Sequence, residues 1–165
     1  IKAFHEFCQN NDFKEKLLII GDNQNTEYFN ECLNLIRDKR INNVEFLGNK
    51  SPEELSLIYS SAKLLVMASS YEGLPRVLIE SGLCGTPSLA SNIQGISDPF
   101  GKHGGTILYN LDDTEDFQIK LKNFINDEKI QIDLQEKSHL LSAKLSGKDK
   151  FLNNWIEIER IIYEK

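Results

Sequence analysis

Residues 63–91 read KLLVMASSYEGLPRVLIESGLCGTPSLAS, and this stretch decides the fold. An apolar run at 63–69 and a second one at 86–91 flank a short amphipathic segment that is entered through Gly73 and Pro75. Apolar runs of this length, separated by a helical pattern, are typical of buried strands in a parallel sheet. The stretch therefore predicts a strand, a helix and a second strand that runs parallel to the first.

The same alternation of apolar runs and helical patterns recurs on both sides of residues 63–91. Further strands are predicted at 16–22, 43–48 and 104–110, and further helices at 27–40, 52–62, 115–125, 129–145 and 148–164. Residues 1–9 also have apolar side chains at helical spacing. The alternation predicts an α/β fold, a doubly wound parallel sheet with a helical C-terminal end, in which ligands bind at the carboxyl ends of the strands. We expect residues 1–165 to form a single domain and to be a fragment of a longer chain.

The composition excludes several classes of function. The 165 residues are 40% hydrophobic and carry a formal net charge of -6 without a basic cluster, so no nucleic acid partner is expected. Cys8, Cys32 and Cys84 lie far apart and match neither a zinc spacing nor a disulfide framework, which fits a reducing cytoplasm. No apolar run approaches the roughly 18 residues of a membrane-spanning helix, and no Asp-x-Asp pattern suggests a metal.

The helix that starts after Gly73 has the features of an anion site. Its free backbone N–H groups face the carboxyl edge of the sheet, where the helix dipole adds about half a positive charge. Gly73 permits close approach of a ligand, and Pro75 suits the first helical turn because it has no N–H to leave unpaired. Arg76 opposes the dipole by about 0.3–1 kcal/mol unless an anion lies nearby, whereas a side chain extended into solvent would lose almost nothing. A phosphate group is the predicted ligand.

Two carboxylates flank this helix start. Glu72 precedes the helix and Glu80 lies inside it, so they are suited to accept hydrogen bonds from two sugars on either side of a diphosphate. We expect the apolar neighbours of Glu80 to cover it, and a buried carboxylate needs hydrogen-bonding partners. The alternatives are that Glu72 interacts only with the helix dipole and that Glu80 belongs to a solvated helical face.

At these residues the chain resembles the retaining, nucleotide-sugar-dependent glycosyltransferases of family 4, which have the two-domain GT-B fold. Residues 68–91 align without a gap to the pattern P-S-x-x-E-G-F-G-x-x-x-x-E-A-M-A-C-G-x-P-V-V-A-S of the Rossmann-like C-terminal half of that family. The segments KLLIIGD, NVEFLGNKSPEELSLIYSSAKLLVM and GGTILYNLDD also follow in the family's order, and the resemblance covers residues 1–145. Pro75 stands where the family has its second glycine.

The resemblance implies roles for particular residues. The residues implied to bind the substrate are Glu72, Gly73, Leu74, Arg76, Val77, Glu80, Gly48, Asn49 and Lys50. Glu72 corresponds to the catalytic carboxylate that contacts the donor sugar, and Glu80 to the carboxylate that holds the ribose hydroxyls. The loop 48–50 corresponds to the segment that lines the nucleobase, or is only a strand-to-helix turn. The segment 92–100 receives no role.

The resemblance also implies an activity for the complete protein. It would be a retaining hexosyltransferase that moves a sugar from a UDP- or GDP-linked donor to an acceptor hydroxyl in glycan or polysaccharide synthesis, without a cofactor or a metal. The acceptor, a glycan or a lipid-linked sugar, would bind through an N-terminal domain that this chain lacks, so the fragment alone is expected to be inactive. The expected location is the cytoplasm, or the inner face of the cytoplasmic membrane through peripheral association.

Alternatives from other classes remain open. A noncatalytic α/β nucleotide-binding or receiver-like interaction module has a similar size, but a receiver needs paired acids after the first strand, where only Asp22 is present. A dinucleotide-binding oxidoreductase requires G-x-G-x-x-G after that strand, whereas GDNQNT has a single glycine. These residues disfavour the receiver and the oxidoreductase.

Overall fold

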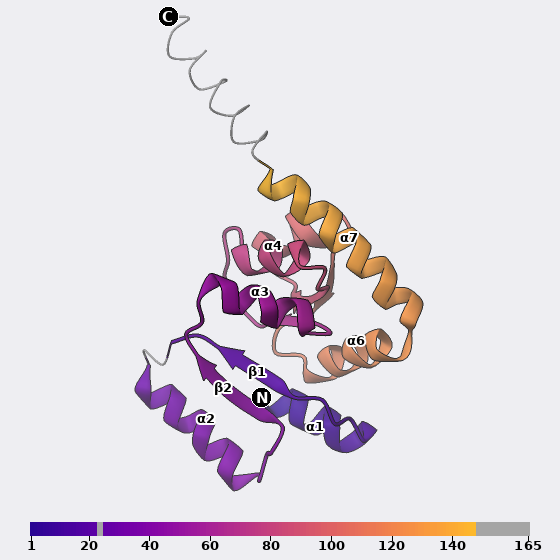
Figure 1. Ribbon diagram of the computed structural model, residues 1–165. Helices are drawn as coiled ribbons and strands as arrows, with labels where there is room; N and C mark the ends of the chain where they lie inside the picture. Colours follow the sequence, from indigo (N-terminus) through magenta and orange to yellow (C-terminus); the bar gives the residue numbers. More distant parts are fainter. Residues whose placement is uncertain (23–24, 148–165) are drawn as a thin grey trace, which may run out of the picture.

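The predicted strands and helices are present in the part of the chain that the structure describes. The computed structural model describes residues 1–22 and 25–147 (Figure 1). Its strands are β1 (Leu17–Ile20), β2 (Val44–Gly48), β3 (Leu65–Met67), β4 (Ser88–Ser91) and β5 (Thr106–Tyr109). Its helices are α1 (Lys2–Asn11), α2 (Thr26–Asp38), α3 (Pro52–Ser61), α4 (Arg76–Leu83), α5 (Gln94–Ile96), α6 (Thr114–Asn126) and α7 (Glu128–Ser146), with a π-helical turn, η1, at Ser97–Gly101. The predicted helix at 148–164 lies outside the described residues.

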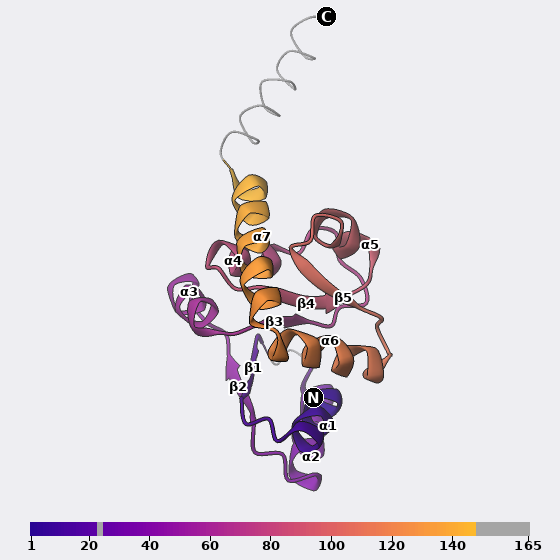
Figure 2. The same cartoon turned by 90° about the vertical axis from the view of Figure 1, so that its right-hand side faces the viewer.

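The strands pair in parallel, and they form two groups. β1 pairs with β2 from Leu17 opposite Val44 onward, whereas β4 pairs with β3 on one side and with β5 on the other. The strand order is β2-β1 in the smaller sheet and β3-β4-β5 in the larger one (Figures 1 and 2). A cavity of about 660 Å³ separates β1 from β3. The predicted parallel α/β class is confirmed, with a division between β1 and β3 that no sequence pattern indicates.

Helices cover both faces of the larger sheet. Neighbouring side chains of β4 point to opposite sides: Leu89 packs in a core with α1 and α6, and Ala90 packs in a second core with α4, α5 and η1. Both side chains are fully buried. This arrangement is the doubly wound one that the sequence predicts, and it directs a ligand to the carboxyl ends of the strands.

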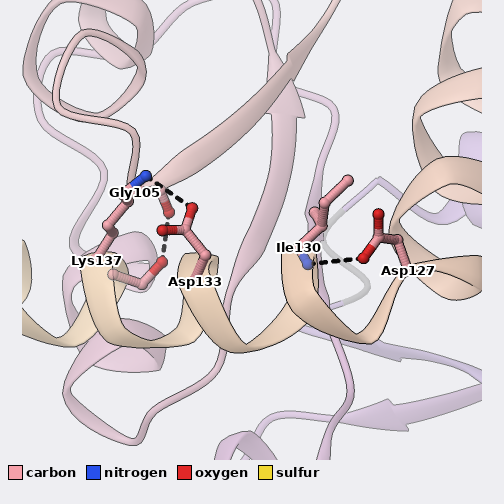
Figure 3. Close-up of polar contacts among 6 residues, drawn as sticks. Gly105, Asp127, Ile130, Asp133 and Lys137 are labelled. Carbon is pink, nitrogen blue, oxygen red and sulfur yellow. Dashed lines mark hydrogen bonds and ion pairs between the residues drawn. The ribbon is translucent and has the colours of Figure 1, made fainter.

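Side-chain caps fix where four of the described helices begin, α2, α3, α6 and α7. At α3, the Ser51 hydroxyl accepts a hydrogen bond from the Glu54 N–H, and the Glu54 carboxylate accepts one from the Ser51 N–H. At α7, the Asp127 carboxylate accepts a hydrogen bond of 3.1 Å from the Ile130 N–H (Figure 3). These caps satisfy backbone N–H groups that every helix start leaves unpaired. The start of α4 has no side-chain cap.

Candidate functional site

The turn between β3 and α4 is the place where the sequence predicts an anion site. α4 begins at Arg76, and Pro75 is its N-cap, one position earlier than the first-turn place that the sequence predicts. The reason is that Pro75 has an extended backbone (φ -71°, ψ 109°) while its carbonyl already accepts a hydrogen bond from the Leu78 N–H. Among the described residues, nothing accepts a hydrogen bond from the N–H of Arg76 or Val77. Two backbone donors at the positive end of the helix dipole are therefore available to a ligand.

The surface around this helix start is open. Gly73 and Arg76 are exposed, and the side chains of Leu74 and Val77 are 53% and 36% exposed. Arg76 forms no ion pair with any residue that the structure describes. Its guanidinium therefore adds a positive charge without an ion-pair partner to the turn that carries the two free N–H groups.

Glu72 is held in place by the neighbouring loop. It is half-buried, and a Cβ added to Gly95 of α5 would overlap the Glu72 carbonyl group, so the two loops touch backbone to backbone. The Ser91 hydroxyl at the end of β4 also donates a hydrogen bond to the Ser69 carbonyl, which follows β3. The sequence analysis assigns no role to Gly95. The one feature that could have indicated its role is that it is a glycine shortly after the end of a strand, where close approach of another backbone excludes a side chain.

Glu80 lies on the second turn of α4 and is exposed, so the prediction that its neighbours bury it is wrong. The buried positions of α4 include Leu78 and Gly82, and Glu80 lies two residues, or about 200° around the helix, from each of them. Burial raises the pKa of the Tyr59 hydroxyl on α3, and the Glu80 carboxylate raises that pKa further. Glu80 therefore faces α3 and solvent, where its oxygens are accessible to the hydroxyl groups of a ligand.

The loop predicted to contact the base lies at the end of β2. Gly48 has a positive φ of 66°, which a glycine adopts without strain. Asn49 is exposed, and Lys50 Nζ lies 3.5 Å from Glu54 Oε1, so the charge of Lys50 is already paired at the start of α3. This loop belongs to the smaller sheet, and among the described residues no hydrogen bond or ion pair joins it to the turn at Glu72. Residues 72–80 therefore lie together at the start of α4, whereas residues 48–50 form a separate loop.

Packing against α7 fixes the position of α4. A Cβ added to Gly82 would overlap the Ser142 hydroxyl and lie 2.8 Å from the Ser138 carbonyl oxygen. His139 Nδ1 lies 3.3 Å from the Gly82 carbonyl oxygen, and the Ser138 hydroxyl donates a hydrogen bond to the Gly105 carbonyl before β5. Small residues therefore let the two helices approach closely, and α7 ties α4 to the larger sheet.

The site offers backbone donors, two carboxylates and one guanidinium. Within residues 1–22 and 25–147, no three His, Cys, Asp or Glu side chains lie close enough together to hold a metal ion. The three cysteines are free, and burial raises the pKa of Cys8. In the same part of the chain, no helix combines the length and the apolar character that crossing a bilayer requires.

The chain matches a known protein family over most of its length. The family model described as Glycosyl transferases group 1 covers residues 1–140. The chain belongs to this family. An uncharacterized glycosyltransferase of Methanocaldococcus jannaschii is 27% identical to this chain over 135 residues, which are 82% of the chain and 37% of that protein. The predicted resemblance is confirmed, and the chain spans well under half the length of this relative.

Solved structures share the fold of the group 1 domain. A glycosyltransferase from Rickettsia africae superimposes with a TM-score of 0.85 at 18% identity, covering 98% of this chain and 44% of its own. HepE of Anabaena, solved in complex with UDP-glucose, superimposes with a TM-score of 0.76 at 18% identity, covering 87% of this chain and 40% of its own. At these identities the likeness establishes the fold, and it confirms the predicted fold class.

Proposed function

We propose that residues 1–165 form the donor-binding domain of a longer, two-domain glycosyltransferase that moves a hexose from a nucleoside diphosphate to an acceptor hydroxyl with retention at the anomeric carbon. The observation that carries this proposal is the start of α4. There, two unpaired backbone N–H groups and the exposed Arg76 side chain lie on one turn, which begins at the half-buried Glu72. HepE, which has a similar fold, is solved with UDP-glucose, and this supports a nucleotide sugar as the ligand class.

The diphosphate binds at the helix start because the charge there is uncompensated. In the absence of an anion, Arg76 opposes the helix dipole by about 0.3–1 kcal/mol. A diphosphate reverses the sign of that interaction and accepts hydrogen bonds from the N–H groups of Arg76 and Val77. Each hydrogen bond to a charged acceptor contributes about 1.5–3 kcal/mol, so the diphosphate provides a large share of the affinity.

The two carboxylates recognise hydroxyl groups. An ionised carboxylate accepts hydrogen bonds on both oxygens, which suits a pair of neighbouring hydroxyls. Glu80, exposed toward α3, binds the ribose, and Glu72, positioned by Gly95, binds the hexose. Asn49, exposed after β2, contacts the base, while Gly48 and Lys50 shape the loop that presents it.

The transfer breaks the bond between the anomeric carbon and a diphosphate oxygen. Negative charge grows on the leaving diphosphate, and the Arg76 guanidinium and the free N–H groups of α4 stabilise it. Glu72 lies beside the sugar, where its negative charge stabilises the oxocarbenium-like ring and orients the hydroxyls. Gly73 and Leu74 complete the exposed turn around the sugar.

The remaining parts of the reaction lie outside this domain. The acceptor, a glycan or a lipid-linked sugar in polysaccharide synthesis, binds in the second domain, so residues 1–165 alone bind the nucleotide weakly and transfer nothing. The complete protein acts in the cytoplasm or at the inner face of the cytoplasmic membrane, and it needs no cofactor beside the donor.

The test uses the complete protein with UDP- and GDP-linked hexoses. Glu72→Gln should lower kcat about 100-fold with little change in KM, because its interaction grows in the transition state. Glu80→Gln should raise the nucleotide Kd about 10-fold, the expected effect of weakening a charged hydrogen bond. Glu31→Gln, at an exposed carboxylate of α2, is the matched control and should change neither constant. If all three variants fold and behave alike, the proposal is wrong.

A further inference from the structure

Tyr71 is an exposed aromatic residue that the proposed function does not use. It is 86% exposed, more than any other large apolar or aromatic residue in the part of the chain that the structure describes. Within residues 1–22 and 25–147, its side chain forms no hydrogen bond and contacts no other aromatic ring. Tyrosine is common where a protein meets a ligand, because its ring buries apolar area while its hydroxyl stays in contact with water. Tyr71 directly precedes Glu72, the carboxylate proposed to bind the hexose.

The backbone is held in place on both sides of Tyr71. On one side, the Ser69 carbonyl accepts a hydrogen bond from the Ser91 hydroxyl at the end of β4. On the other side, the Glu72 carbonyl lies so close to Gly95 that a Cβ there would overlap it. The backbone position of Tyr71 is therefore fixed before any ligand binds. A tyrosine has only two side-chain torsions left to order, so a contact with its ring loses little conformational entropy.

The exposed apolar side chains continue from Tyr71 to the start of α4. Leu74 is 53% exposed and Val77 is 36% exposed, and they follow Tyr71 at intervals of three residues. Pro75 and Leu78, in contrast, are buried. Exposed apolar side chains that lie close together beside polar groups are typical of a surface that binds a ligand or a partner. This stretch therefore offers more contact area than the diphosphate uses.

The order of the proposed donor contacts places Tyr71 at the hexose end of the donor. Glu80 is proposed to bind the ribose and Glu72 the hexose, with the diphosphate between them at the start of α4. Tyr71 is the next residue in the same direction along the chain. In the transfer, the acceptor oxygen bonds to the anomeric carbon, the bond from that carbon to the diphosphate breaks, and the acceptor proton passes to a diphosphate oxygen. The acceptor therefore lies against the hexose, on the side where the chain continues to Tyr71.

We propose that the ring of Tyr71 stacks on a pyranose ring of the acceptor, and hence that the acceptor is a sugar. This inference rests on the proposed function, because the donor contacts define where the acceptor lies. A pyranose has a face of C–H groups and a rim of hydroxyls, which suits an exposed aromatic ring next to a carboxylate. The second domain holds the rest of the acceptor. The rival partner of Tyr71 is the second domain itself, packed on the ring without a sugar between them.

Steady-state kinetics of the complete protein, with UDP- and GDP-linked hexoses as donors, tests the proposal. The acceptor probes are the methyl pyranosides of glucose, galactose and mannose, with glycerol as a hydroxyl compound that has no ring, and donor hydrolysis measures transfer to water. Tyr71→Ala should lower kcat/KM for the best pyranoside about 10-fold, the loss expected for an aromatic contact. Transfer to glycerol, donor hydrolysis and the donor KM should not change. Tyr71→Phe keeps the ring and should retain about half or more of the parent kcat/KM.

A matched control removes an exposed apolar side chain elsewhere. Ile132 is 59% exposed on α7, one turn before Gln135, which approaches Gly85 after the end of α4. Ile132→Ala should leave every rate unchanged. Because Tyr71 and Ile132 are both exposed, thermal unfolding should show that both alanine variants fold like the parent.

The outcomes separate the acceptor contact from its rivals. Equal losses of transfer and hydrolysis in Tyr71→Ala would place Tyr71 against the donor or the second domain and overturn the proposal. Unchanged transfer in Tyr71→Ala, or an equal loss in Tyr71→Phe, would overturn it as well. So would a parent protein that hydrolyses the donor but transfers to none of the pyranosides. A parent protein that neither binds nor hydrolyses a nucleotide sugar instead refutes the proposed function, and the Tyr71 contact falls with it.

Discussion

The two sheets differ in how completely their strands are surrounded. Every residue of β4 is buried, with a strand on each side and helices on both faces. β1 has a strand on one side only, and Leu18 is 40% exposed. α2, whose Phe29 packs edge-on against Phe46 of β2, has no fully buried residue. The half that carries α4 therefore has its own core, whereas the β1-β2 half depends on whatever fills the neighbouring cavity.

One leucine from each sheet, Leu89 and Leu18, should respond very differently to truncation. Leu89→Ala in β4 should lower the free energy of unfolding by about 3–5 kcal/mol, because it leaves a cavity in a fully buried position. Leu18→Ala in β1 should cost less than about 1 kcal/mol, because its side chain is partly solvated. Urea unfolding of both variants measures the difference, and similar losses would contradict the contrast between the sheets.

The contact of α4 with α7 should be the next most sensitive feature of the larger half. Gly82→Ala should lower the free energy of unfolding by about 1–3 kcal/mol, because its methyl group overlaps α7. Gly147→Ala is the control, since a Cβ there meets its nearest atom, the Ala143 carbonyl oxygen, at 3.5 Å. Thermal unfolding should separate the two variants, and equal stability would mean that the helices shift apart without cost.

Gly95 should link the stability of the larger half to the proposed activity. Gly95→Ala forces the α5 loop away from the Glu72 backbone, at a cost of about 1–2 kcal/mol. In the complete enzyme we expect kcat to fall about 10-fold while nucleotide affinity changes little, because the displaced residue is Glu72 rather than Glu80. Steady-state kinetics with a binding titration tests this, and unchanged kcat in a folded variant would remove Gly95 from the site.

The smallest predicted effect is a change in the pKa of the Tyr59 hydroxyl, on α3 at the boundary between the two sheets. Burial and then the Glu80 charge raise the pKa of its hydroxyl, so Glu80→Gln should lower that pKa. The folded state holds the Tyr59 proton more tightly than the unfolded state, so this stabilisation is present below about pH 10 and is lost as the pH rises through the folded pKa. Glu80→Gln should therefore lose less stability at alkaline pH than the parent. An absorbance titration of tyrosine ionisation, with Glu31→Gln as control, measures the shift; identical curves would place Glu80 away from α3.

The sequence predicts the strands and most helices because each apolar run and each helical stripe is a local signal. The packing between loops is not local. The close approach of Gly95 to Glu72 joins segments that follow different strands, and the segment 92–100 forms α5 and η1 without a periodic pattern long enough to read. The sequence also fails to predict that Glu80 is exposed. Its apolar neighbours in the sequence suggest burial, but residues next to one another in sequence do not lie on the same side of a helix.

The division of the strands into two sheets also cannot be predicted from the residue pattern of any single strand. β1 and β3 both read as buried strands, and nothing in either run tells which strand lies beside it. Residues 72–80 of the candidate site form one continuous stretch, so the sequence predicts that they lie together. The loop 48–50 follows a strand of the other sheet, and its distance from this stretch cannot be predicted from the sequence. Its part in binding the base stays a prediction.

A crystal structure of the complete protein with a UDP- or GDP-linked hexose tests the central claim most directly. We predict diphosphate oxygens within about 3.2 Å of the backbone nitrogens of Arg76 and Val77, with the ribose on Glu80 and the hexose on Glu72. A nucleotide sugar bound elsewhere, or bound with both carboxylates turned away from its hydroxyls, would contradict the account.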